Sequence, residues 1–314
     1  MLSPDLPRNG QRVGRYTILA PRGVGATGAV FAAYDDELER CVAIKILRRS
    51  VTDVPRLREQ LRREGRALAR LAHPAVVTVH DVGVFRDQVY LVMELVDGGT
   101  LRTWLADGGR HWTEIVRMAL GLARGLQAIH AAGLLHRDVK PDNILVDRTD
   151  RAFLADFGLA ERPLCHPEPR IVPVGDTGGV ATCTTASRLL IGTPAYMALE
   201  LLTGGPASAH SDQFAFCVTV FEALYGVRPF TGSRLEDLAA RIAGGRITPT
   251  ANADIPAAVH AAVVRGLAAS PADRHASMSE LIVALERAAL HPPRWRFAFL
   301  VGAAGLALRA LFAG

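Results

Sequence analysis

The chain has 314 residues, of which 49% are hydrophobic and 21% are charged, and its net charge is +5. This composition excludes bulk disorder, and the length suits two domains or one large two-lobed domain. The four cysteines lie far apart, which argues against a disulfide framework or a zinc cluster and favours a reducing compartment. Basic residues are scattered along the chain, so we expect no nucleic-acid partner.

The N-terminal third reads mostly as strands. Residues 1–15 are polar, with no apolar stretch of the kind that starts a secretory signal. Apolar and β-branched runs predict strands at 16–20, 29–34, 41–47, 76–84 and 89–96. One helix is predicted over 55–72, with Asp53 as its N-cap.

The rest of the chain has helical periodicity, and a linker near 94–99 separates the two parts. Helices are predicted over 113–132, 213–225, 235–243, 257–268 and 277–289, the last opened by a capping box of Ser277 and Glu280. Residues 161–191 read as a long loop of the kind that is usually functional or disordered. We therefore expect a small β-rich lobe followed by a larger α-rich lobe.

A glycine-rich segment, 23–30, has the pattern GxGxxGxV. Glycines allow backbone N–H groups to approach phosphate oxygens, because no Cβ stands between them. A dinucleotide-binding loop of this kind leads into a helix, whereas here a strand follows. The segment therefore predicts a hairpin that covers phosphates.

Only two of the 36 basic residues are lysines, Lys45 and Lys140. A compact ammonium and a planar guanidinium are not interchangeable at a tight site, so these positions attract interest. Lys45 shares a strand face with the small Ala43, which could cover a flat base while Lys45 reaches phosphates. Glu64 falls on the apolar stripe of the predicted helix and needs a partner, for which Lys45 is the natural choice. The alternatives are a solvent-facing lysine and a Glu64 paired with a nearby arginine.

A polar segment, 136–143, follows the helix predicted over 113–132. Transfer of a group to a hydroxyl needs a carboxylate, a cation for the developing charge and a metal ligand. Asp138, Lys140 and Asn143 supply these in that order. Asp156, in Asp156-Phe157-Gly158, is a second oxygen ligand for Mg²⁺.

These five motifs, in this order and spacing, resemble the eukaryotic-type (Hanks-type) serine/threonine protein kinases, over about residues 16–290. Lys140, two residues after Asp138, is typical of the Ser/Thr form, and the segment 211–218 resembles bacterial, especially myxobacterial, members. The resemblance implies an α+β bilobal fold, with an antiparallel N-lobe sheet and one key helix in 16–96 and a mainly helical C-lobe in 97–290. It also matches Asp212 to a buried Asp and Arg274 to an arginine that pairs with Glu200.

The resemblance further implies roles for individual residues. Asp138, Lys140, Lys45 and Glu64 would be catalytic, and Asn143 and Asp156 would bind Mg²⁺, or Mn²⁺ in its place. ATP would contact Gly23, Val24, Gly25, Gly28, Val30, Ala43, Lys45, Met93, Glu94, Val96 and Leu145. Thr185 and Ser187 would be regulatory phosphorylation sites, whose phosphate pairs with Arg137, and Thr193 would belong to the loop that seats the acceptor residue.

Three positions depart from the family pattern. Arg22 stands where the family has an aliphatic residue that covers adenine. Leu199 replaces the proline of the family's Ala-Pro-Glu triplet, and Gly65 lies within the predicted helix. They motivate a second hypothesis, a pseudokinase that binds nucleotide as a scaffold. A third is a small-molecule phosphotransferase of related fold. Enzymes of that kind lack the full acceptor-loop set, so Thr193, Glu200 and Arg274 argue for a protein substrate instead.

The end of the chain leaves two interpretations open. Residues 297–308 are apolar, and with Arg309 snorkelling the apolar stretch reaches the end of the chain. It is either a membrane anchor, which would hold a cytoplasmic kinase domain at the inner membrane, or a helix packed on the C-lobe. The partners expected are ATP, a protein substrate with a Ser or Thr acceptor, and a second copy of the chain for trans-autophosphorylation.

Overall fold

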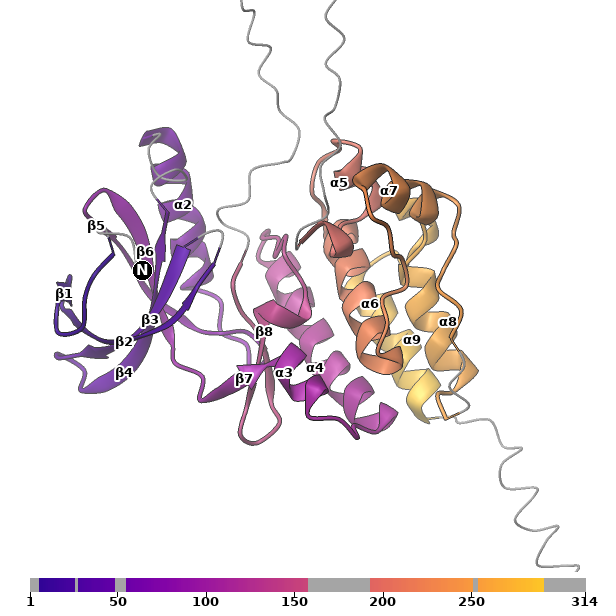
Figure 1. The fold of residues 1–314 in the computed structure, drawn as a ribbon, viewed down its shortest axis with the longest axis horizontal. Helices are drawn as coiled ribbons and strands as arrows, with labels where there is room; N and C mark the ends of the chain where they lie inside the picture. The colour runs from indigo at the N-terminus through magenta and orange to yellow at the C-terminus, as the bar shows by residue number, and fades with distance from the viewer. Residues whose placement is uncertain (1–5, 26–27, 49–54, 158–192, 251–253, 291–314) are drawn as a thin grey trace, which may run out of the picture.

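The structure is a computed structural model that describes residues 6–25, 28–48, 55–157, 193–250 and 254–290. The loop predicted over 161–191, with Thr185 and Ser187, and the apolar segment 297–314 lie outside the described residues. A sheet-rich lobe and a helical lobe lie side by side (Figure 1), which confirms the predicted two-lobed α+β architecture. No helix in the described ranges is long and apolar enough to cross a membrane.

The N-lobe is a six-stranded antiparallel sheet in the order β1-β2-β3-β4-β6-β5. Its strands are β1 (Arg12–Val13), β2 (Tyr16–Val24), β3 (Gly28–Asp35), β4 (Arg40–Leu47), β5 (Val79–Phe85) and β6 (Gln88–Glu94). The sheet begins before residue 16, because β1 pairs with β2 and Val13 is fully buried. β5 begins later than predicted, since Val76 makes only an isolated bridge to Leu154.

The helix α2 (Pro55–Leu68) covers one face of this sheet. Leu61 is buried against Leu47 and Val89, as its place on the apolar stripe predicts. Gly65 is explained by the same contact. A Cβ there would lie 3.0 Å from Leu91 Cδ2, so the glycine lets the helix approach the sheet closely. Its cost in helix propensity is offset by this packing.

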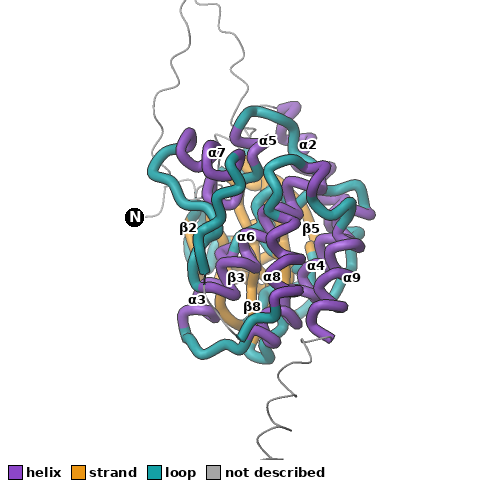
Figure 2. Tube along the Cα trace, turned by 90° about the vertical axis from the view of Figure 1, so that its right-hand side faces the viewer, coloured by secondary structure: helices purple, strands orange, loops and turns teal. Residues whose placement is uncertain are grey.

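The C-lobe is built around one buried helix, α6 (Ala209–Tyr225), which lies among α4, α8 and α9 (Figure 2). Twelve of its residues are buried, so it is apolar on nearly every side. The other helices are α3 (Leu101–Ala106), α4 (Trp112–Ala131), α5 (Leu199–Leu202), α7 (Leu235–Ala243), α8 (Ala257–Gly266) and α9 (Met278–Leu290). A small sheet of β7 (Gly98–Thr100), β8 (Ile144–Asp147) and β9 (Ala152–Leu154) borders the N-lobe. The short helices α3 and α5 were not predicted, because four to six residues show no period.

A buried ion pair ties α5 to the end of the C-lobe. Arg274, whose side chain is fully buried, donates to the two carboxylate oxygens of Glu200 at 2.8 and 2.9 Å. It also donates to the carbonyl oxygens of Ala268 and His210, and its guanidinium lies 5.0 Å from the ring centroid of Phe214. The predicted Arg274–Glu200 pair is therefore confirmed, without the proline that the family pattern places before Glu200.

Glu200→Gln should destabilise the protein strongly. Removing one charge of a buried pair leaves the other uncompensated, so we expect a loss of about 3 kcal/mol in the free energy of unfolding in urea. The matched control is Glu286→Gln, which breaks an exposed pair with Arg124 and should cost less than about 1 kcal/mol. Equal losses in the two variants would contradict a structural role for the buried pair.

Candidate active site

The polar segment between α4 and β8 is held by one buried carboxylate. Asp212 on α6, only 2% exposed, accepts hydrogen bonds from the backbone N–H groups of His136 and Arg137, both at 2.8 Å. Its Oδ2 also lies 2.9 Å from Nε2 of His130 on α4. Arg137 has φ of +69°, a left-handed conformation that a non-glycine residue adopts only when its surroundings compensate. Asp212 supplies that compensation.

His136 connects this segment to the one that carries Asp156. Its ring is fully buried and lies 4.9 Å, centroid to centroid, from the ring of Phe157. Burial lowers the pKa of His136, so the ring is neutral at pH 7. The two segments are therefore joined by packing rather than by a charge.

Asp138 has one occupied and one free carboxylate oxygen. Its Oδ2 accepts hydrogen bonds from Nζ of Lys140 and Nδ2 of Asn143, both at 2.6 Å. Its Oδ1 is buried and has no hydrogen-bond partner among the described residues. A buried acceptor without a partner is costly, and such groups in native proteins usually have a functional explanation. The geometry leaves this oxygen available to a substrate hydroxyl.

The predicted ion pair between Lys45 and Glu64 is wrong for this structure. Lys45, 5% exposed on β4, forms its ion pair with Asp156. Glu64 instead accepts from Arg137 Nη1 at 3.4 Å and from Gln60 at 2.9 Å. A buried ammonium needs a carboxylate, and Asp156 supplies it, while α2 places Glu64 within reach of Arg137. The alternative partner considered for Glu64, an arginine, is the one found.

The glycine-rich segment forms the predicted hairpin, since β2 pairs antiparallel with β3. Gly28 has a packing role, because a Cβ there would overlap the backbone carbonyl of Ile46. Gly23 has no atom within 4 Å of its Cβ position, and Gly25 has only the Gly28 carbonyl oxygen, at 4.0 Å. The space beside these two glycines is open, which suits the close approach of a phosphate.

Several predicted base-contacting residues gather between the lobes. Met93, Val96 and Leu145 pack in one cluster with three buried residues, Val77, Phe153 and Ala155. Three other predicted residues lie on the same sheet: Ala43 beside Met93, Val30 beside Lys45, and Glu94 beside Val42. Val24 is 58% exposed on the hairpin, and Arg22 beside it is exposed.

The oxygen donors present fit a magnesium ion. Asp156, paired with Lys45, supplies a carboxylate, and Asn143, bonded to Asp138, supplies a carboxamide. Their segments are joined by a hydrogen bond from the Ala155 N–H to the Asn143 carbonyl oxygen at 2.9 Å. Mg²⁺ prefers such hard oxygen ligands and typically takes one or two carboxylates with substrate phosphates. No cluster of three or more His, Cys, Asp or Glu in the described part of the chain could hold a metal.

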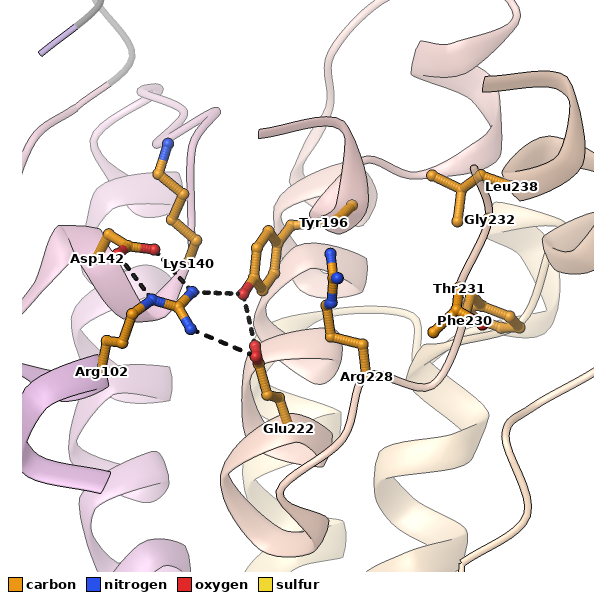
Figure 3. Close-up of a pocket in the computed structure, with 11 residues that line it drawn as sticks. Arg102, Lys140, Asp142, Tyr196, Glu222, Arg228, Phe230, Thr231, Gly232 and Leu238 are labelled. Carbon is orange, nitrogen blue, oxygen red and sulfur yellow. Dashed lines mark hydrogen bonds and ion pairs between the residues drawn. The ribbon is translucent and has the colours of Figure 1, made fainter. Parts of the chain in front are cut away.

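One ionic network near the site was missed in the sequence. Arg102 on α3 donates to both carboxylate oxygens of Asp142 at 2.8 Å and to the Tyr196 hydroxyl at 2.9 Å, and Tyr196 donates to Glu222 at 2.5 Å (Figure 3). Hydrogen bonding to Asp142 raises the pKa of Arg102 and lowers that of Asp142. Burial, and then Glu222, raise the pKa of Tyr196. Glu222 gave a usable signal, since it is the only carboxylate in the apolar stretch 213–225 and therefore needs a partner.

Asp212→Asn should weaken the catalytic segment. The amide replaces one acceptor oxygen by a donor that faces N–H groups, so we expect a loss of about 2 kcal/mol in the free energy of unfolding. Urea unfolding would measure it. Asp237→Asn, an exposed change on α7, is the control and should move the midpoint little. An unchanged midpoint for Asp212→Asn would contradict the anchoring role.

Comparison with known proteins identifies relatives over most of the chain. The family model "Protein kinase domain" matches residues 16–263. The serine/threonine-protein kinase PknE of Mycobacterium tuberculosis is 33% identical over 90% of this chain and 47% of PknE. PknA of the same species is 36% identical over 90% of this chain and 63% of PknA. The chain thus spans about half the length of PknE. The predicted similarity to myxobacterial kinases in particular stays a prediction.

Solved structures give the same picture. The kinase domain of Mycobacterium tuberculosis PknI has a TM-score of 0.65 and 26% identity, with 90% of this chain and 99% of that one covered. The fold therefore agrees with the family that the sequence comparison gives.

Proposed function

This chain belongs to the protein kinase family, and from that premise we propose that it is a serine/threonine protein kinase that uses ATP. One observation carries the proposal: the free, buried Oδ1 of Asp138, whose other oxygen is held by Lys140 and Asn143. A scaffold without catalysis would have no use for that arrangement. The names of the relatives lend the scaffold hypothesis no support either.

The residues of the site divide the reaction among them. Asp138 orients the acceptor hydroxyl and accepts its proton as the new O–P bond forms and the bond between the γ- and β-phosphates breaks. Lys140, beside it, offsets the charge on the transferring phosphoryl group. Lys45 positions the α- and β-phosphates, and the hairpin of β2 and β3 covers them.

Asn143 and Asp156 would hold Mg²⁺, or Mn²⁺ in its place, which neutralises phosphate charge when bound. Lys45 now occupies the carboxylate of Asp156, so it must leave that contact to reach phosphates. Glu64, once free of Arg137, can then pair with Lys45. The observed arrangement is one in which these charges neutralise each other within the protein.

Arg137 links this exchange to regulation. A phosphate on Thr185 or Ser187 would carry close to two negative charges and would compete with Glu64 for Arg137. Its binding would release Glu64 toward Lys45. A second copy of the chain would transfer this phosphate to the loop, so the autophosphorylation would occur in trans.

The apolar segment 297–314 would anchor the protein to the inner membrane, with the kinase domain in the cytoplasm. Fractionation of the full chain and of a chain that ends at Pro293 tests this, since the anchor predicts that only the former sediments with membranes.

Asp138→Asn should abolish phosphoryl transfer while ATP binding persists. The carboxamide cannot accept the hydroxyl proton, so we expect a fall in kcat of about a hundredfold or more. Transfer of labelled phosphate to a generic acceptor protein measures it, followed by mapping of the sites in the chain. Lys45→Met should abolish transfer as well, because the phosphates lose their cation.

The controls for this test are Asp237→Asn and the unaltered protein. If the unaltered protein transfers phosphate no faster than Asp138→Asn while both bind ATP, the kinase activity is contradicted. The chain would then be better described as a nucleotide-binding scaffold.

Arg137→Ala should uncouple activity from loop phosphorylation. In the unaltered protein, preincubation with ATP should raise the initial rate, because the phosphate takes Arg137 from Glu64. In Arg137→Ala the contact between residue 137 and Glu64 is already absent, so the loop phosphate has no contact to break. Preincubation should then change the initial rate by less than about twofold. Initial rates before and after preincubation decide this. A normal stimulation in Arg137→Ala would show that Arg137 does not receive the phosphate.

A further inference from the structure

A cavity of about 540 Å³ lies beside the catalytic segment, between α3, α6 and α7. Lys140, whose ammonium contacts Asp138, forms one side of it. Tyr196, three residues after Thr193, stands in the middle (Figure 3). Since it adjoins both Asp138 and the segment expected to seat the acceptor, the cavity is placed to receive a substrate side chain close to the acceptor.

Both carboxylates in this cavity are already occupied by the protein itself. The guanidinium of Arg102 spans them, with 2.8 Å contacts to Asp142 and a 3.5 Å contact to Glu222. Tyr196 donates its hydroxyl proton to the other oxygen of Glu222. A cationic substrate side chain would have to displace an arginine that is bound in fork geometry, which is the stronger kind of ion pair.

Arg228, by contrast, is a cation without a counter-ion among the described residues. It lines the cavity, is exposed, and has no ion pair or hydrogen bond with any described residue. In Figure 3 its guanidinium and the ammonium of Lys140 point the same way, on the two sides of Tyr196. Arginine stays protonated at any physiological pH. Arg102 and Lys140 are held by Asp142, Glu222 and Asp138, so Arg228 is the cation of this lining that has no carboxylate partner among the described residues.

The rest of the cavity limits what can enter. Phe230 and Leu238, both nearly fully buried, line the side away from Lys140, together with Thr231 and Gly232. An apolar wall next to a free guanidinium suits a short chain that ends in an anion, and a guanidinium binds carboxylate or phosphate with two parallel hydrogen bonds.

We propose that this cavity selects protein substrates with an anionic side chain, a carboxylate or a phosphate, within a few residues of the acceptor. Arg228 is the residue that determines this specificity, and Arg102 is the internal cation that excludes basic substrates. The proposal rests on the proposed kinase activity, since it names the substrate class of the same site.

Matched peptides test the specificity. Each carries one threonine acceptor in a neutral background, with Ala, Asp, phosphoserine or Arg at one of three positions on either side. With the unaltered protein we expect the Asp or phosphoserine peptide to exceed the Ala peptide about fivefold in kcat/KM at one position. Arg228→Ala should reduce that ratio to near one. Arg241→Ala, an exposed change on α7 outside the cavity, should preserve it.

The two anions are distinguished by the same set. A preference for phosphoserine alone would assign the cavity to substrates that are already phosphorylated, and a preference for both to acidic substrates in general. Either supports the proposal if Arg228→Ala removes it. No preference for an anion in the unaltered protein, or one that survives Arg228→Ala, overturns it.

A binding measurement separates this proposal from the proposed activity. Labelled peptides with Ala in place of the acceptor report affinity without transfer, by fluorescence anisotropy. Absence of transfer to every peptide and protein would contradict the kinase activity, while an affinity ratio between Asp and Ala peptides that depends on Arg228 would still support the cavity. Equal affinities would overturn the cavity even with full activity.

Arg102→Gln tests the excluding role. Without its guanidinium, Asp142 and Glu222 face the cavity uncompensated, so the Arg peptide should rise relative to the Ala peptide by about fivefold. Arg102→Lys keeps the charge but loses the fork and should give a smaller rise. An unchanged discrimination in both variants would overturn the role of Arg102.

Discussion

The carboxylate of Asp212 is the constraint on which the site depends. It lies on the most buried of the described helices, yet its hydrogen bonds go to the backbone of another segment and to His130 of a second helix. Two N–H groups are thereby fixed at a point where Arg137 takes a left-handed backbone conformation. Asp138 is the next residue, so the position of its backbone is fixed by the buried helix α6 through Asp212.

Charges near the site pair with whichever partner lies within reach. Lys45 is buried and pairs with Asp156, while Glu64 is half-buried on α2 and pairs with Arg137. Both contacts use groups that the reaction or its regulation would need elsewhere. Because burial makes an unpaired charge costly, each exchange requires a replacement for the lost partner. Nucleotide, metal and loop phosphate can each supply one.

Much of the fold and of the candidate site could be predicted from the sequence, wherever a feature depends on neighbouring residues or belongs to a family motif. The hairpin of β2 and β3, the face shared by Ala43 and Lys45, and the Arg274–Glu200 pair are of this kind. The partner of Glu64 could not, because it depends on where α2 lies relative to a segment 73 residues away. Arg102 escaped notice for the same reason, since Asp142 is 40 residues from it along the chain.

Lysine and arginine divide the ionic contacts according to their shapes. The two lysines each place a compact ammonium against a carboxylate of the proposed site, Asp156 for Lys45 and Asp138 for Lys140. Two arginines bind a carboxylate through both of its oxygens: Arg102 binds Asp142, and Arg274 binds Glu200. A planar fork suits a fixed, bidentate contact, whereas an ammonium can exchange one oxygen for another without breaking a matched pair. The fixed contacts of Arg102 and Arg274 therefore suit permanent neutralisation, whereas the ammonium groups of Lys45 and Lys140 suit charges that would change partners in the proposed phosphoryl transfer.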